Sequence, residues 1–70
     1  MHTTIVQIVS GAGIHQAWTF DAKTKPASVS AAMRFCRRGW ELDTTVSYAD
    51  FTKVEKVSAG PDLTYVRLHC

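Results

Sequence analysis

Seventy residues allow one small domain, spanning residues 1–70, and leave no room for a second hydrophobic core. The chain is 46% hydrophobic and 20% charged, a composition typical of a folded protein rather than a disordered one. Eight Lys and Arg against six Asp and Glu give a net charge of +2, too small to indicate a large polyanion-binding surface. These values exclude a multidomain enzyme, a coiled coil, a repeat array and a membrane span.

The first predicted elements are two strands joined by a small-residue turn. Residues 5–9 are rich in β-branched side chains, and residues 10–13 contain two glycines that permit a tight turn. Residues 14–20 alternate, with Ile14, Gln16, Trp18 and Phe20 on one face. We therefore expect a hairpin. The Gly-x-Gly at this turn lacks the third glycine and the following helix of a phosphate-binding loop, so nucleotide binding is not indicated.

The next predicted element is a helix over residues 28–38, with Ser28 as its N-cap and Gly39 as the glycine that ends it. At 100° per residue, one sector of this helix is apolar and another is rich in arginine. The apolar sector consists of Val29, Ala32, Met33 and Cys36, and the polar sector of Ser30, Arg34, Arg37 and Arg38.

The remaining pattern predicts further strands. Residues 40–48 alternate clearly, whereas residues 51–57 form a weaker strand candidate that Lys53, Glu55 and Lys56 interrupt. Residues 58–62 contain Gly-Pro-Asp and indicate a turn, and residues 63–69 form a final alternating strand. Because lysines protect exposed sheet edges, we expect the weak strand to lie at an edge.

The expected fold is α+β: a four- or five-stranded antiparallel sheet packed on one helix (about 28–38), in the order β-β-α-β-(β)-β. A helix is about 10 Å wide and strands lie about 4.8 Å apart, so one helix leaves part of the sheet uncovered. Both faces of residues 5–9 and 63–68 carry apolar side chains. We therefore expect a homodimer with the first or the final strand at its interface, or capture of a partner protein.

The helix-to-strand junction carries the sequence Gly39-Trp40-Glu41-Leu42. It resembles a motif of small bacterial β-α-β-β domains of unknown function, in which a helix ends in Gly-Trp-Glu-Leu and leads directly into a strand. The resemblance implies a β-α-β-β-type sheet and a non-enzymatic role. It supplies no substrate and no catalytic residue.

Five basic residues form the first candidate binding surface: Lys23, Lys25, Arg34, Arg37 and Arg38. They could contact phosphates of a nucleic acid or an acidic protein. They could equally be a solvated helix face with cations placed favourably near the helix C-terminus, which Glu41 and Asp43 partly neutralise. No aromatic residue except Phe35 accompanies them on the helix, so a base-stacking platform is poorly supported.

Aromatic residues form the second candidate surface. We expect most of them in the core and Trp18, Tyr48 and Tyr65 as partner-contacting anchors. The residues with metal-ligand chemistry, His2, His15, Cys36, His69 and Cys70, lack the spacing of a zinc site. Cys36 falls on the apolar stripe as a buried thiol and Cys70 on an exposed tail, and the alternative, a bridge between them, would require the final strand to end beside the helix. We therefore expect no catalytic residue, no metal and no cofactor.

The sequence thus predicts a non-catalytic protein-binding module, an adaptor or inhibitor, that acts as a homodimer. Its size is that of the inhibitors and adaptors that phages and mobile elements encode. The alternative is a nucleic-acid-binding protein that uses the basic helix face. The absence of a basic start and of a long apolar stretch favours the cytoplasm over secretion or a membrane.

Overall fold

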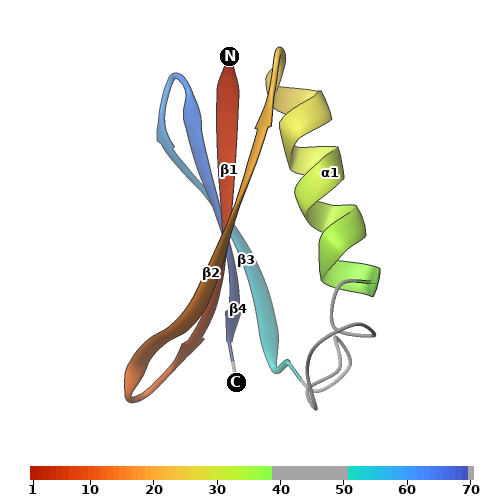
Figure 1. Ribbon diagram of the computed structural model, residues 1–70. Coiled ribbons are helices and arrows are strands. Elements are labelled where there is room, and N and C mark those ends of the chain that lie inside the picture. The colour runs from red at the N-terminus through yellow and green to blue at the C-terminus, as the bar shows by residue number, and fades with distance from the viewer. Residues whose placement is uncertain (39–50, 70) are drawn as a thin grey trace.

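One helix lies against one face of a four-stranded sheet (Figure 1). The computed structural model describes residues 1–38 and 51–69. Its elements are β1 (His2–Ser10), β2 (Gly13–Ala22), α1 (Lys25–Arg38), β3 (Lys53–Gly60) and β4 (Leu63–His69). The expected small α+β fold with one helix on a sheet is confirmed for these residues. The strand expected at 40–48 and the helix-ending Gly39 lie outside the described residues.

The sheet is mixed, with the strand order β2-β1-β4-β3. The pairs β1–β2 and β3–β4 are antiparallel, whereas β1 and β4 are parallel. The expectation of an entirely antiparallel sheet is therefore wrong at the central pair. The chain forms two hairpins, and α1 separates them in the sequence. The helix runs back along the sheet between the two hairpins, so β3 runs in the direction of β2 and β4 in the direction of β1 (Figure 1).

Strands β1 and β4 occupy the centre because they carry apolar side chains on both faces. Strand β3, which contains Lys53 and Lys56, lies at an edge as expected. Both sides of β1 and of β4 are occupied by neighbouring strands, so neither strand has a free edge for pairing with another copy. A dimer that uses β1 or β4 must therefore form through a face of the sheet.

A bulge changes the face on which Ile14 lies. Ile8 pairs with Gln16 but Val9 pairs with Ile14, so His15 is an extra residue in β2. Directly opposed residues share a face, which places Ile14 on the side opposite Trp18 and leaves it 59% exposed. The expected grouping of Ile14 with Trp18 is wrong for this reason. Gly13, next to the turn, has a φ of 113°, a conformation that favours glycine.

The helix begins three residues earlier than expected. The Thr24 hydroxyl accepts a hydrogen bond from the amide of Ala27 (3.4 Å), so Thr24 rather than Ser28 caps α1. Ser28 is instead fully buried inside the helix. Its hydroxyl donates to the carbonyl of Phe20 (2.8 Å) and lies 2.7 Å from the hydroxyl of Thr4. Ser28 therefore ties α1 to both β1 and β2.

The core lies between α1 and the sheet. It consists of Val6, Ile8, Ala32, Cys36, Val66 and Leu68. The expected apolar stripe of the helix is confirmed, since Ala32 and Cys36 are fully buried and Val29 and Met33 are half-buried. Phe35 packs on β2, with ring centroids 4.8 Å from Trp18 and 5.1 Å from Phe20. Within the described part of the chain, no helix is both long and apolar enough to cross a membrane.

Candidate functional site

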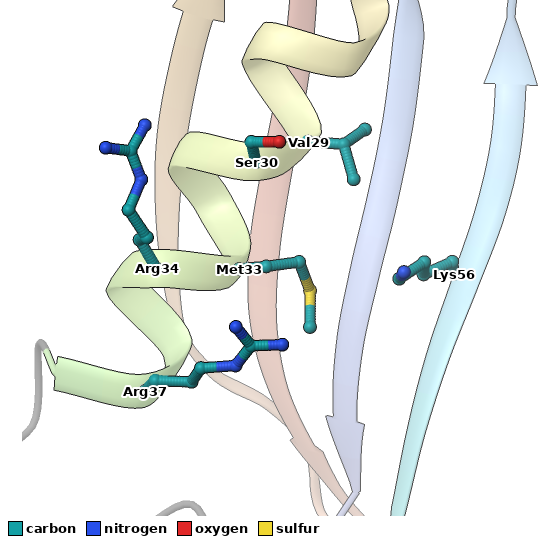
Figure 2. A pocket seen from close by; sticks show the side chains of 6 residues that line it. All are labelled: Val29, Ser30, Met33, Arg34, Arg37 and Lys56. Atoms are coloured by element: carbon teal, nitrogen blue, oxygen red, sulfur yellow. The ribbon is translucent and has the colours of Figure 1, made fainter.

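A groove of about 530 Å³ lies between α1 and β3 (Figure 2). We call it the α1–β3 groove. In Figure 2, Val29, Met33 and Arg37 extend from α1 toward the strands, and Lys56 faces the helix from β3. Arg34 lies along the outer side of the helix. The lining residues are Val29, Ser30, Met33, Arg34, Arg37 and Lys56.

Helical spacing explains why these side chains meet. Val29, Met33 and Arg37 follow one another at intervals of four residues, which places them in a row on one face of α1. Eight residues of helix separate the ends of this row, a length of about 12 Å at 1.5 Å per residue. The row therefore forms an apolar wall that ends in a guanidinium group.

The charged side chains that the structure places in the lining of the α1–β3 groove are all positive. Arg34, Arg37 and Lys56 line the groove, and no carboxylate is among the lining residues that the structure describes. The ion pairs of the described residues join Glu55 to Lys53 and to His69, so none of the three groove cations takes part in them. Within residues 1–38 and 51–69, no acidic side chain forms an ion pair with these three cations, so their charge can attract an outside anion.

The structure brings together only part of the basic surface that the sequence predicts. Arg34 and Arg37 are exposed and line the groove, but Lys25 begins the helix, nine residues or about 13 Å before Arg34. Lys23 precedes the helix and borders a different hollow, together with Met1, Asp21 and Ala22. Arg38 is the last residue of α1, and its side chain lies outside the described part.

Lys56 is the groove residue that the sequence analysis missed. It was interpreted only as protection of a sheet edge. The two-residue period of β3 contains a usable signal, because Lys56 alternates with Glu55 and Val57 and so shares a face with Val54, which packs against the core. That face is the one on which α1 lies.

The opposite face of the sheet has no described element against it (Figure 1). We call it the open sheet face. Register places Ile5, Tyr65 and Val57 side by side across β1, β4 and β3. The side chains of the face are half-buried. Its central residues are Ile5, Gln7 and Val9 of β1, Leu63, Tyr65, Arg67 and His69 of β4, and Glu55 and Val57 of β3.

Charged groups on the open sheet face have partners on the same face. The Arg67 guanidinium lies 5.2 Å from the centre of the Tyr65 ring, and its Nε donates to Gln7 Oε1 (3.2 Å). Glu55 lies 3.2 Å from His69 Nε2 through one oxygen and 3.9 Å from Lys53 Nζ through the other. The face thus combines an apolar row with charges of both signs.

The three predicted aromatic anchors have separate positions. Tyr65 lies on the open sheet face, where an incoming surface could contact it. Trp18 is half-buried and packs against Phe35, so much of its ring belongs to the contact between α1 and β2. Tyr48 lies outside the described residues. The structure therefore does not bring Trp18 and Tyr65 into one surface.

The thiol of Cys36 is free and fully buried, as expected. Burial raises its pKa to about 11, and the nearby positive charge of Arg37 only partly opposes this rise. The thiol is therefore protonated at neutral pH and is a poor nucleophile. The described residues contain no group of three or more His, Cys, Asp or Glu side chains that could hold a metal ion.

The pKa of Cys36 predicts a loss of stability at high pH. The thiol has a pKa near 9.0 in the unfolded chain and about 11 in the folded one, so the unfolded state releases its proton first. Stability from the neutral thiol is fully present below about pH 9 and falls as pH rises toward 11. The difference in unfolding free energy between the wild type and Cys36→Ala should shrink over that range in urea titrations. A constant difference would contradict the buried thiol.

Comparison of the chain with protein-family models, with curated proteins and with solved structures gives no match.

Proposed function

We propose that the chain is a small non-catalytic protein-binding module, an adaptor or inhibitor, that works as a homodimer. The observation that carries this proposal is the open sheet face, where Ile5, Tyr65 and Val57 form an apolar row that none of the described elements covers. Removing apolar surface from water is favourable by about 25 cal/mol per Å², so a protein that covers this row gains binding free energy. The free and buried Cys36 thiol is consistent with a reducing cytoplasm.

The charges of the open sheet face favour a second copy as the covering protein. A two-fold interface places the same patch on both subunits, so the patch must complement itself. Glu55 lies beside Arg67 in the register and contacts His69, and Lys53 is next to it on the same edge strand. A face with both signs can place each carboxylate against a cation of the other copy. The described lining of the α1–β3 groove carries cations without carboxylates and cannot pair with itself in this way.

Sedimentation equilibrium on the full chain tests this proposal. At tens of micromolar we expect a species of twice the 7.8 kDa chain mass, which dissociates on dilution. Added salt should weaken the dimer only moderately, because the apolar row supplies much of the binding energy. A single 7.8 kDa species across the whole concentration series would contradict the homodimer.

A further inference from the structure

The α1–β3 groove has a different chemistry from the open sheet face and needs a different occupant. We infer that it binds a short acidic segment of a foreign protein, one in which aliphatic residues alternate with Asp or Glu. This inference rests on the proposed protein-binding function and names the partner's chemistry.

Charge complementarity gives the first requirement on that partner. Arg37 and Lys56 face the groove, Arg34 borders it from the outer side of the helix, and the described lining contains no carboxylate. A guanidinium can form paired hydrogen bonds with a carboxylate, and an ammonium group offers three further donors. The occupant must therefore carry more than one negative charge.

The apolar wall gives the second requirement. Val29 and Met33 are half-buried and form the apolar part of the helix wall, with Arg37 at the end of their row and Lys56 across the groove on β3 (Figure 2). A methionine adapts its shape to irregular aliphatic surfaces. An anion that lacked apolar groups would leave this wall uncovered, so the occupant needs an aliphatic side chain between its carboxylates.

The length of the wall sets the size of the segment. About 12 Å of helix separates Val29 from Arg37, and an extended chain advances about 3.3 Å per residue. Three or four residues of the partner therefore fill the groove. Contacts of this size give weak, reversible binding, and a homodimer that presents two grooves would strengthen binding to a partner with two such segments.

The same cations could in principle contact nucleic-acid phosphates, but the groove favours a peptide. The described residues that line it include no aromatic side chain on which a base could stack. A phosphate backbone would also leave Val29 and Met33 without an apolar partner. Nucleic acid is accordingly one outcome that the test must be able to detect.

Fluorescence anisotropy with labelled peptides tests the inference. The probe is Asp-Leu-Glu-Leu-Asp with glycine-serine flanks, and the comparison peptides are Asp-Ser-Glu-Ser-Asp and Lys-Leu-Lys-Leu-Lys. We expect the first peptide to bind the wild-type chain at least about tenfold more tightly than either comparison. Replacing both arginines by glutamine (Arg34→Gln and Arg37→Gln) should weaken it at least about tenfold. Lys56→Gln alone should give a smaller loss.

A matched control removes the same charge elsewhere. Lys23→Gln and Lys25→Gln together lower the net charge by two, as the arginine pair does, but both residues lie outside the groove lining. This control should retain the wild-type affinity. Circular dichroism checks that each variant folds, and Lys56→Gln on the other wall provides a second test if the arginine pair fails to fold.

Three binding patterns would overturn the inference, as would the absence of binding to the acidic peptide. One is equal loss of affinity in the groove pair and in the lysine pair, and another is equal binding of the serine-containing acidic peptide. The third is tighter binding of a labelled 20-base-pair duplex or single strand with loss in the groove pair, which would assign the groove to nucleic acid. Sedimentation distinguishes failure of the groove proposal from failure of the homodimer proposal. A monomer that binds the acidic peptide refutes only the homodimer. A dimer that does not bind the peptide refutes only peptide binding in the groove.

Discussion

Replacing Leu68 by alanine is expected to lower the free energy of unfolding by about 2–5 kcal/mol. Leu68 is fully buried in the core between α1 and the sheet and is the largest side chain with no exposure among the described residues. Its truncation removes apolar contacts and leaves a cavity. A domain of this size rarely has more than about 3–5 kcal/mol of stability. The variant should therefore be substantially unfolded at 37 °C, as urea denaturation followed by circular dichroism will measure.

Ile14→Ala is the matched control for this change. It also truncates a large aliphatic side chain in a strand, but the bulge at His15 leaves Ile14 59% exposed. We expect a change within about 0.5 kcal/mol. Both variants must be compared at a concentration at which the chain is monomeric, because Ile14 shares the open sheet face with Val9 and dimerisation adds to apparent stability. A loss for Ile14→Ala as large as that for Leu68→Ala would contradict the position of the bulge.

Val57→Asp is expected to weaken the homodimer by about 30-fold or more, equivalent to a loss of at least about 2 kcal/mol. Val57 is half-buried on the open sheet face and lies opposite Tyr65 in the register. An aspartate there would place an unpaired charge against the apolar row of the other copy, where its desolvation is costly. Sedimentation equilibrium over a range of concentrations measures the shift.

Ser58→Asp introduces the same charge one residue further along β3. Ser58 is exposed, and the alternation of the strand places it on the other face of the sheet. The Ser58→Asp dimer should have nearly the same dissociation constant as the wild-type dimer. If the two variants weakened the dimer equally, the effect would come from net charge or from the edge strand, and the open sheet face would not be the interface.

Much of the fold follows from residue patterns that sequence analysis detects. The apolar stripe of α1 and the alternation of β4 predict the core correctly, since Ala32, Cys36, Val66 and Leu68 are all buried. Lysines in a weakly apolar strand predict an edge, and β3 is one. These features depend on local periodicity, which a single sequence records directly.

Features that depend on pairing between distant strands were not predicted. The parallel contact of β1 and β4 joins residues about sixty positions apart, such as Ile5 and Tyr65, and nothing local specifies its direction. The sequence nevertheless indicates that β1 and β4 are central strands, because each carries apolar residues on both faces. The bulge at His15 has no such indication in the sequence, and one extra residue was enough to move Ile14 to the other face.

The candidate site was predicted only in part, for the same physical reason. Arg34 and Arg37 stand out on a helical wheel because they lie three residues apart on the polar sector. Lys56 joins them only through the tertiary packing of α1 over the sheet. Lys25 belongs to the same helix but is too far along its axis to take part. A list of basic residues therefore gives the charge of a surface but not its location.

The central claim is that the open sheet face holds a second copy of the chain. Isotope-filtered nuclear Overhauser measurements on a mixture of labelled and unlabelled chains test this most directly, because they detect only contacts between copies. We predict intermolecular signals from the Tyr65 ring and from the methyl groups of Ile5 and Val57. Signals confined to Gly13–Ala22, or no intermolecular signal from a chain that sediments as a dimer, would contradict the claim.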